Sequence, residues 1–254
     1  MRVTFLGTGT SVPSLERSSS SVLIEPGESK ILIDMGAGVM RRLLERGVQI
    51  GDLSHIFFSH FHLDHCGEFA SFLFATKYGG FFPSREPFVV IGARGLHRFY
   101  DKLREIHGHW VDMEGRMTII ELDAGKTDGI LFDDFEAFSR PMIHTPDSLG
   151  YRIIDRDGRS VTYSGDTDIS DELVALARGT DLFVCESSFP DKMKRKGHLT
   201  PSEAGTIATA AGVKKLVLTH FYPEIESIDI RGQCRKTYRG PLLIARDLMA
   251  CLVE

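Results

Sequence analysis

One run of residues constrains this chain more than any other: Ser-His-Phe-His-Leu-Asp-His, at 59–65. It directly follows the apolar segment His-Ile-Phe-Phe and contains three histidines and an aspartate, His60, His62, Asp64 and His65. On an extended segment, His60 and His62 point the same way because side chains alternate with a period of two. If the chain then turns into a helix, Asp64 and His65 face a second position. This mixture of imidazole and carboxylate ligands favours a divalent metal, zinc above all.

Further ligand-type residues stand at the ends of other apolar, β-rich segments. His144 follows the segment 133–143, Asp166 ends Val-Thr-Tyr-Ser-Gly-Asp, and His220 ends Lys-Leu-Val-Leu-Thr-His. Residues at strand ends can converge on one edge of a sheet. Taken singly, Asp166 would also suit the cap of a helix beginning near Ile169, and His220 could simply end a strand. Together with the first cluster, these residues supply enough ligands for two metals.

Short apolar strands alternate with helical segments along the whole chain. Strands are expected within 2–7, 20–25, 29–36, 55–60, 87–93, 117–122, 129–140, 149–155, 159–166, 181–187 and 214–221. Helices are expected within 38–47, 67–80, 95–109, 169–179 and 201–212, and the tail 240–254 fits either state. Strands dominate each half, with helices interleaved. This pattern predicts an α/β (αββα) sandwich, in which two mixed β-sheets pack face to face with the helices outside.

The composition sets broad limits on the organisation and partners of the protein. No Pro/Ser-rich linker or charge block divides the 254 residues, so one domain spanning 1–254 is expected, and 42% hydrophobic residues support a sizeable core. A formal net charge of −5 argues against a dedicated nucleic-acid binder, which would usually be basic.

The cysteines and the N-terminus indicate the compartment. The four cysteines are far apart and form no Cys-x-x-Cys pair, which fits a reducing compartment. The N-terminus lacks a basic region followed by a long apolar stretch, and no window resembles a membrane span. A soluble, cytoplasmic protein with no membrane partner is expected.

In their order, these motifs resemble the five ligand motifs of the metallo-β-lactamase superfamily. More narrowly, the chain resembles the ribonuclease Z branch. The segments that carry the resemblance are 5–25 with its glycines and serines, Ile-Leu-Ile-Asp-Met-Gly-Ala-Gly at 31–38, Ser-Leu-Gly-Tyr-Arg-Ile at 148–153, 182–189 and 197–221. The resemblance covers most of the chain, and its motifs are specific as a set.

The resemblance implies a dinuclear zinc centre with two zinc ions per chain. His60, His62 and His144 would hold one zinc, and Asp64, His65 and His220 the other, with Asp166 bridging them. A hydroxide between the two ions would be the nucleophile, and Asp64 could help accept the proton of the water. Manganese or iron could replace zinc, because mixed His/Asp sites discriminate poorly among these ions.

The resemblance also implies a catalytic pair outside the ligand set. His198 would lie over the scissile phosphate, held by Glu186, and would stabilise phosphate charge or protonate the leaving oxygen. Alternatively, His198 caps the next helix or lies on the surface. Thr200 has a simpler interpretation as the N-cap of that helix, with Pro201 at its first position and Glu203 completing a capping box.

Several residues near the motifs have expected roles outside the ligand set. Asp34 is expected to hydrogen-bond a metal ligand or its loop, and Cys66 suits packing better than thiolate ligation. The basic run Lys192, Lys194, Arg195 and Lys196 is either a solvated loop or a segment that approaches an anionic substrate. His109 and Trp110 either line the cleft that contains the metal site or lie away from it.

The chain departs from the ribonuclease Z pattern where RNA would be gripped. Only residues 145–165 separate His144 from Asp166, which leaves no room for the protruding arm that bacterial short forms insert there. The segment Leu-Thr-His-Phe-Tyr-Pro-Glu also lacks the usual serine and arginine after the last histidine motif. The metal centre is therefore expected to be intact and the RNA-binding arm to be absent.

These considerations predict a metal-dependent hydrolase, a phosphodiesterase that acts on a small or nucleotide-type phosphodiester. The alternatives are a transfer-RNA 3′-processing endoribonuclease, an arylsulfatase- or lactonase-type hydrolase on the same scaffold, and a metal-binding protein without turnover. A nucleic-acid substrate is not favoured but stays open, as does a homodimer.

Overall fold

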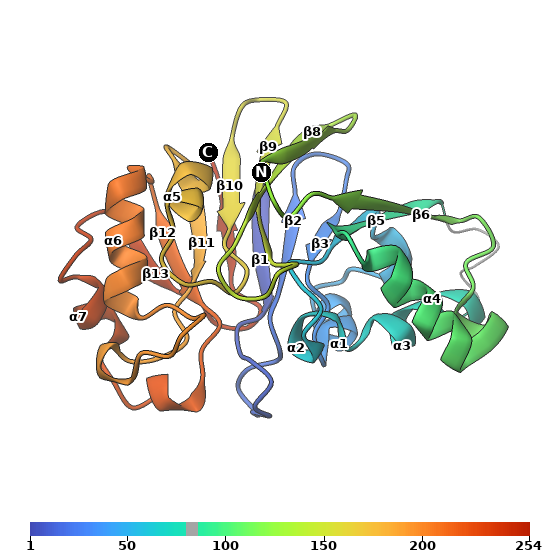
Figure 1. The fold of residues 1–254 in the computed structure, drawn as a ribbon, viewed down its shortest axis with the longest axis horizontal. Coiled ribbons are helices and arrows are strands. Elements are labelled where there is room, and N and C mark those ends of the chain that lie inside the picture. The colour runs from blue at the N-terminus through green and yellow to red at the C-terminus, as the bar shows by residue number, and fades with distance from the viewer. Residues whose placement is uncertain (80–85) are drawn as a thin grey trace.

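Two seven-stranded β-sheets lie face to face in the computed structural model, which describes residues 1–79 and 86–254 (Figure 1). The first sheet has, in spatial order, β14 (Ala250–Leu252), β1 (Arg2–Gly7), β2 (Ser21–Glu25), β3 (Ile31–Ile33), β4 (His55–Phe57), β5 (Phe88–Ala93) and β6 (Met117–Leu122). The second has β13 (Leu242–Ile244), β12 (Leu216–Thr219), β11 (Leu182–Glu186), β10 (Ser160–Tyr163), β9 (Leu149–Asp155), β8 (Phe135–Pro141) and β7 (Asp128–Leu131).

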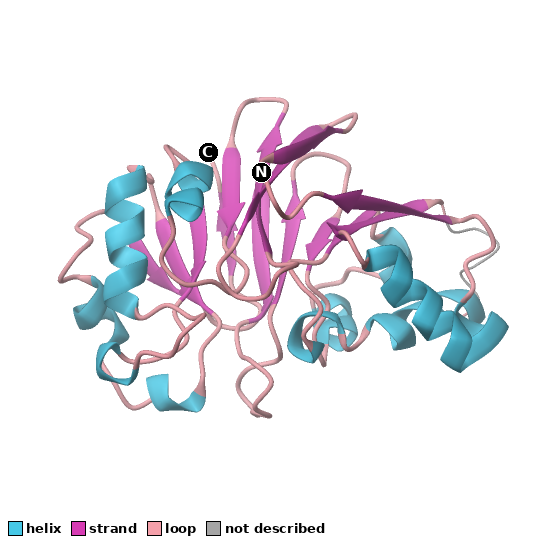
Figure 2. Ribbon diagram, in the orientation of Figure 1, coloured by secondary structure: helices cyan, strands magenta, loops and turns pink. Residues whose placement is uncertain are grey.

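Helices cover the two outer faces of this pair of sheets (Figure 2). The first sheet is flanked by α1 (Val39–Glu45), α2 (Leu63–Cys66), α3 (Phe69–Tyr78) and α4 (Leu96–His107), and the second by α5 (Asp171–Ala177), α6 (Pro201–Ala211) and α7 (Ile230–Cys234). The predicted αββα sandwich is confirmed. The expected helix 67–80 corresponds to α3, although Gly80 lies outside the described residues.

Alternation along each strand divides the apolar residues among three cores. In β2, Val22 and Ile24 enter the core between the sheets, whereas Leu23 packs against the helices of the first sheet. In β11, Val184 faces the central core and Phe183 packs against the helices of the second sheet. Because both faces of these strands are buried, their sequences are continuous apolar runs rather than alternating ones.

The strands that precede the predicted ligands run in one direction within each sheet. β3 and β4 pair in parallel, as do β10, β11 and β12. β8 runs in the same direction as β10, because both pair antiparallel to the strand between them, β9. The carboxyl ends of these strands therefore meet at the same edge of the sandwich, which is the usual place for a site in sheets of this kind.

The tail, for which the sequence left helix and strand open, forms two strands in different sheets. β13 extends the second sheet in parallel to β12, and β14 pairs antiparallel with β1 in the first. Between them, the amide of Leu248 donates to the carbonyl of Phe5, and the amide of Phe5 donates to the carbonyl of Met249. Three-residue strands are too short for a periodic signal, so only their partners decide their conformation. The short helix α7 also had no sequence prediction.

The buried hydroxyl of Tyr151 links the two sheets beside the ligand-bearing edge. Tyr151 is fully buried, and its hydroxyl donates to the carbonyl of Phe58, directly after β4, at 2.7 Å. We expect Tyr151→Phe to lower the free energy of unfolding by about 1–3 kcal/mol, because a buried carbonyl loses its donor. Urea denaturation measures this change. Tyr78→Phe, at an exposed tyrosine, is the control, and equal losses in both variants would contradict the assignment.

Candidate metal centre

All seven predicted ligands lie where strands end at one edge of the sandwich. His60 and His62 follow β4, and the short helix α2 that begins at Leu63 carries Asp64 and His65. His144, Asp166 and His220 follow β8, β10 and β12, respectively. This arrangement brings together residues from both halves of the chain.

The backbone bends sharply at this edge. Asp34 and His220, which each follow a strand directly, have left-handed φ angles of 63° and 60°. Such conformations cost free energy for residues other than glycine and cluster at functional sites. Gly165, with φ of 58°, makes the same turn immediately before Asp166. These turns therefore lie at the points where Asp34, Asp166 and His220 leave their strands.

One group of ligand atoms comes from His60, His62, His144 and Asp166, whose nearest ligand atoms all lie within 4.8 Å of one another. The Nε2 atom of His144 lies 3.1 Å from the Nδ1 atom of His62 and 3.7 Å from Oδ2 of Asp166. The Nε2 atom of His60 lies 3.9 Å from the same oxygen. Three imidazoles and one carboxylate thus surround a single point.

A second group, beside the first, contains Asp64, His65 and His220. The Nε2 atoms of His65 and His220 are 3.3 Å apart, and they lie 3.8 and 3.6 Å from Oδ2 of Asp64. Both also lie close to Oδ1 of Asp166, at 3.3 and 3.2 Å. The two oxygens of Asp166 therefore face different groups, which is the arrangement that a bridging carboxylate requires.

Two unpaired polar atoms indicate that these residues fit a metal. Nε2 of His60 and Oδ1 of Asp166 are buried and have no hydrogen-bond partner. A buried polar atom without a partner costs about 1–3 kcal/mol, and a cation would satisfy both atoms. Nitrogen and carboxylate oxygen donors of this kind suit zinc, manganese or iron. The cluster can hold metal, and its donors suffice for two ions.

The other ring nitrogen of four histidines is held by a neighbouring group, which directs Nε2 toward the centre. Nδ1 of His65 lies 2.7 Å from Asp34, that of His144 lies 2.9 Å from the carbonyl of Gly197, and that of His220 lies 2.9 Å from the hydroxyl of Ser188. Nδ1 of His60 lies 3.1 Å from Oγ of Ser59. His62 differs, because it presents Nδ1 instead of Nε2 to the cluster.

Asp34 supports the second group, as the sequence predicted, through four hydrogen bonds. Besides His65, its carboxylate accepts from the amide and the hydroxyl of Ser59, at 2.7 and 2.8 Å, and from the hydroxyl of Tyr163 at 2.8 Å. Asp34 is fully buried. Since Tyr163 belongs to the second sheet and Asp34 to the first, this carboxylate also joins the sheets beneath the cluster.

Burial and neighbouring charges set the protonation of the cluster. Burial, followed by the neighbouring histidines, holds the pKa of His60 well below its usual value, so its ring is neutral and able to ligate. Burial opposes ionisation of Asp166, but His220 and His65 outweigh it and hold the pKa of Asp166 well below its usual value. Burial raises the pKa of the Cys66 thiol to about 12, which agrees with a packing role.

Glu186 and His198 form the predicted pair beside the cluster. Oε1 of Glu186 lies 3.2 Å from Nδ1 of His198, which in turn lies 3.9 Å from Oδ2 of Asp166. Burial lowers the pKa of His198, but its bond to Glu186 and the nearby charges of Glu186 and Asp166 outweigh burial and raise it. His198 also forms a third candidate ligand group with Asp166 and His220.

Glu186 is itself rigidly held. It is buried, and its carboxylate also accepts from the amides of Thr167 and Leu199 and from the hydroxyl of Ser188. These bonds join the Asp166 loop to the segment that carries His198. Glu186 thus positions both His198 and the loop that carries Asp166.

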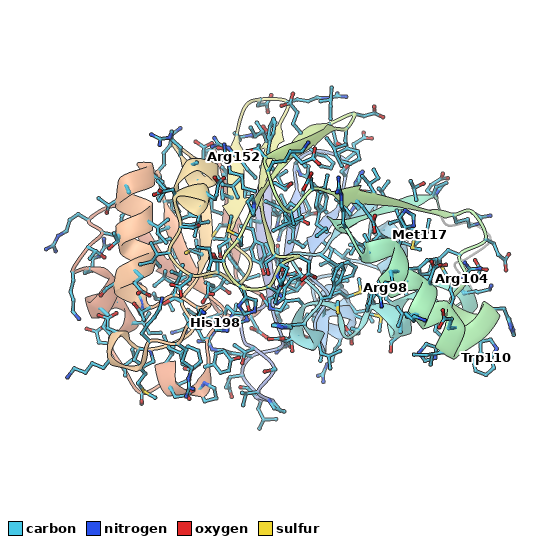
Figure 3. The ribbon with its side chains drawn as sticks, in the orientation of Figure 1. Arg98, Arg104, Trp110, Met117, Arg152 and His198 are labelled. Carbon is cyan, nitrogen blue, oxygen red and sulfur yellow. The ribbon has the colours of Figure 1, made fainter. Side chains whose placement is uncertain are left out.

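Three alternatives left open by the sequence are decided by geometry. The helix after Asp166 is capped by Ser170, whose side chain accepts from the amide of Leu173, so Asp166 is not its cap. Thr200 caps α6 with a capping box, as predicted. Trp110 lies beyond the end of α4, far from His198 (Figure 3), so it does not line the same cleft.

Sequence reasoning missed several supporting residues. Ser59 and Tyr163 bond to Asp34, and Ser188 bonds to Glu186 and His220. Serines and a tyrosine beside apolar strands carry no signal of their own. Gly197 was also missed, although its φ of 83° and its closeness to His144 leave little room for a side chain. Its position directly before His198 was the only available sequence signal.

Comparison with known proteins places the chain in a family. Residues 22–221 match the family model described as the beta-lactamase superfamily domain. An uncharacterized protein of Mycobacterium tuberculosis is 31% identical, covering 95% of this chain and 88% of the relative. Ribonuclease Z of Mycobacterium bovis is 30% identical, covering 98% of this chain and 96% of the relative. The crystal structure of the short form of human tRNase Z is 26% identical, with a TM-score of 0.80 and full coverage of both chains.

The chain therefore belongs to the β-lactamase superfamily, and it is a metallo-hydrolase of the ribonuclease Z-like kind. The resemblance inferred from the motifs is confirmed. In the described part of the chain, no helix combines the length and the apolar character needed to cross a membrane.

Removing the charge of Asp34 tests its support of the cluster. We expect Asp34→Asn to weaken metal binding by about 10- to 100-fold, because His65 loses the carboxylate that orients its ring. Competition with a coloured chelator measures the affinity. Asp134→Asn, which removes a carboxylate bonded to Ser29 at a distance from the cluster, is the control. Unchanged affinity in Asp34→Asn would show that Asp34 does not orient the ligand.

Proposed function

We propose that this protein is a dinuclear-metal phosphodiesterase that acts on a small or nucleotide-type phosphodiester. The observation that carries the proposal is the Glu186–His198 pair, which stands beside two ligand groups that share Asp166. A centre that only stored or transported metal would have no need for an additional histidine held by a buried glutamate.

The proposed cofactor is two Zn²⁺ per chain, which Mn²⁺ or Fe²⁺ could replace. His60, His62 and His144 would hold one ion, and Asp64, His65 and His220 the other, with Asp166 shared. When bound, the ions would make hydroxide available near neutral pH and neutralise charge on the phosphate.

The residues of the chain would bind and orient the substrate and transfer protons. The raised pKa of His198 favours the imidazolium, which would hold the charge that grows on the phosphate or protonate the leaving oxygen. Glu186 would fix the ring of His198. Burial acts to raise the pKa of Asp64, but its bond to His220 and the charges of His65 and His220 outweigh burial and lower that pKa, so Asp64 would be ionised and would accept a proton only as a weak base.

Transfer-RNA 3′-processing is the second candidate, supported by the relatives named ribonuclease Z. The chain between His144 and Asp166 is occupied by β9, β10 and their short connections. This segment thus forms part of the second sheet and does not protrude as an arm. A small diester therefore remains the favoured substrate, ahead of sulfate esters and lactones.

The proposed setting is a reducing, cytoplasmic compartment, and a single domain is proposed for residues 1–254. The four cysteines are free, and Cys66, Cys185 and Cys234 are buried. Thiols kept reduced are typical of such a compartment. A homodimer is also proposed.

A substrate panel tests the proposed function. We expect protein loaded with zinc or manganese to hydrolyse bis(p-nitrophenyl) phosphate and to leave a precursor transfer RNA intact. Release of p-nitrophenolate and gel electrophoresis of the RNA measure the two activities. Cleavage of the RNA at its 3′ end would favour the second candidate. Turnover of aryl sulfates or lactones alone would reject both.

Two variants separate metal binding from catalysis. We expect His62→Ala to lose both bound metal and turnover, because it removes a ligand. We expect His198→Ala to retain metal while turnover falls by about 100-fold or more, the scale of a general acid. Elemental analysis and diester kinetics report the two properties. If His198→Ala kept full turnover with its metal intact, the phosphodiesterase assignment would lose its main support.

A further inference from the structure

The basic run before His198 divides into cations with different environments. The Nζ atom of Lys194 lies 2.7 Å from Asp168 and 2.6 Å from Glu203, so its charge is neutralised within the fold. The guanidinium of Arg195 instead lies 5.1 Å from the ring centre of Phe189. Arg195 is exposed, and among the described residues no carboxylate pairs with it. Arg195, like the exposed Lys192 and Lys196, therefore keeps its charge available at the surface, and its guanidinium does so over an aromatic ring.

The buried ring of Phe189 supports this arginine from below. Its ring is 3% exposed and lies 5.8 Å from the ring of His198. Tyr222 stacks on Phe189, with ring centres 4.4 Å apart and an angle of 21° between the planes. A buried ring that contacts both Arg195 and Tyr222 restricts where each can lie.

The ring of Tyr222 lies beside the proposed catalytic histidine, and Arg195 belongs to the loop that leads into it. The ring of Tyr222 lies 5.9 Å from that of His198 and 6.1 Å from that of the ligand His220. The amide of His198 donates to the carbonyl of Arg195, which fixes the loop between them. A cation and a partly exposed aromatic ring thus stand beside the place where the phosphodiester would bind.

The guanidinium of Arg195 and the ring of Tyr222 favour one class of substrate. A guanidinium that lies over a ring keeps its N–H donors free and suits the oxygens of a phosphate. A tyrosine fixed on one face suits a planar ring, because bases stack on aromatic side chains. Few substrates carry both a planar ring and a second phosphate near a phosphodiester, and nucleotides are the common ones.

We propose that Arg195, Phe189 and Tyr222 form a subsite for one ester group of the substrate, and that this group is a nucleoside bearing a further phosphate. The inference rests on the proposed phosphodiesterase function and narrows its substrate class. Phe189 positions the other two residues, Tyr222 stacks on the base, and Arg195 binds the additional phosphate.

Three diesters with the same leaving group test the subsite. They are methyl p-nitrophenyl phosphate, thymidine 5′-(p-nitrophenyl phosphate), and the same thymidine ester with a 3′-phosphate. All release p-nitrophenol, so differences in kcat/KM report the second ester group. We expect the wild-type protein, loaded with zinc, to prefer the thymidine ester to the methyl ester and the 3′-phosphorylated ester to both.

Single substitutions assign each preference to a residue. We expect Arg195→Gln to abolish the gain from the 3′-phosphate, about three- to tenfold for a partly exposed charge pair. We expect Tyr222→Leu to reduce the preference for thymidine over methyl by about tenfold, the scale of one stacked base. Tyr222→Phe keeps the ring and should retain that preference.

Lys192→Gln is the matched control, because Lys192 is an exposed cation of the same run. It should keep both preferences. Equal loss of the phosphate gain in Arg195→Gln and Lys192→Gln would overturn the subsite in favour of general attraction, as would unchanged ring preference in Tyr222→Leu. Wild-type turnover of the methyl ester without preference would reject the subsite alone. Turnover of none of the three diesters would reject the proposed function and the subsite with it.

Discussion

The carboxylate of Asp34 is the interaction on which the ligand-bearing edge depends. A buried charge is costly unless it is fully hydrogen-bonded, and Asp34 meets this condition with donors from Ser59, His65 and Tyr163. These donors come from the loop after β4, from α2 and from β10. One side chain therefore fixes the turn that presents the ligands, the ring of one ligand and the distance between the two sheets. Its left-handed backbone is tolerated because these bonds determine its conformation.

Asp166 and Glu186 play corresponding roles on the second sheet. Asp166 divides its two oxygens between the ligand groups, and the amide that follows it is held by Glu186. Glu186 also holds His198 and the hydroxyl of Ser188, which contacts His220. The positions of the candidate ligands and of the proposed acid His198 are thus coupled through one buried carboxylate. A substitution at Glu186 would disturb both at once, which makes His198 the better residue for isolating catalysis.

Much of the site was predictable because ligand residues differ in kind from their surroundings. Histidine and aspartate at the ends of apolar strands are unusual, and the order of the motifs resembles a known family. Among the residues that hold the candidate ligands or His198 in place, only Asp34, which stands in a recognisable turn, and Glu186 were predictable. Ser59, Tyr163 and Ser188 could not be found in the same way, because their role depends on which strands become neighbours. The same holds for Phe189 and Tyr222, which are 33 positions apart (222 − 189) yet stack closely.

The sequence by itself determined the layer order, most strands and helices, and the identity of the metal-ligand candidates. Local apolar runs, caps such as Thr200 and the ligand cluster at 59–65 are properties of short segments, so they can be recognised without a partner. Only the tertiary structure decided the fate of the tail, whose two three-residue strands enter different sheets. It also decided that Lys194 of the basic run pairs with carboxylates whereas Arg195 lies over an aromatic ring. Those outcomes depend on contacts between distant segments. The free energy of such a contact depends on both segments together, so neither segment alone predicts it.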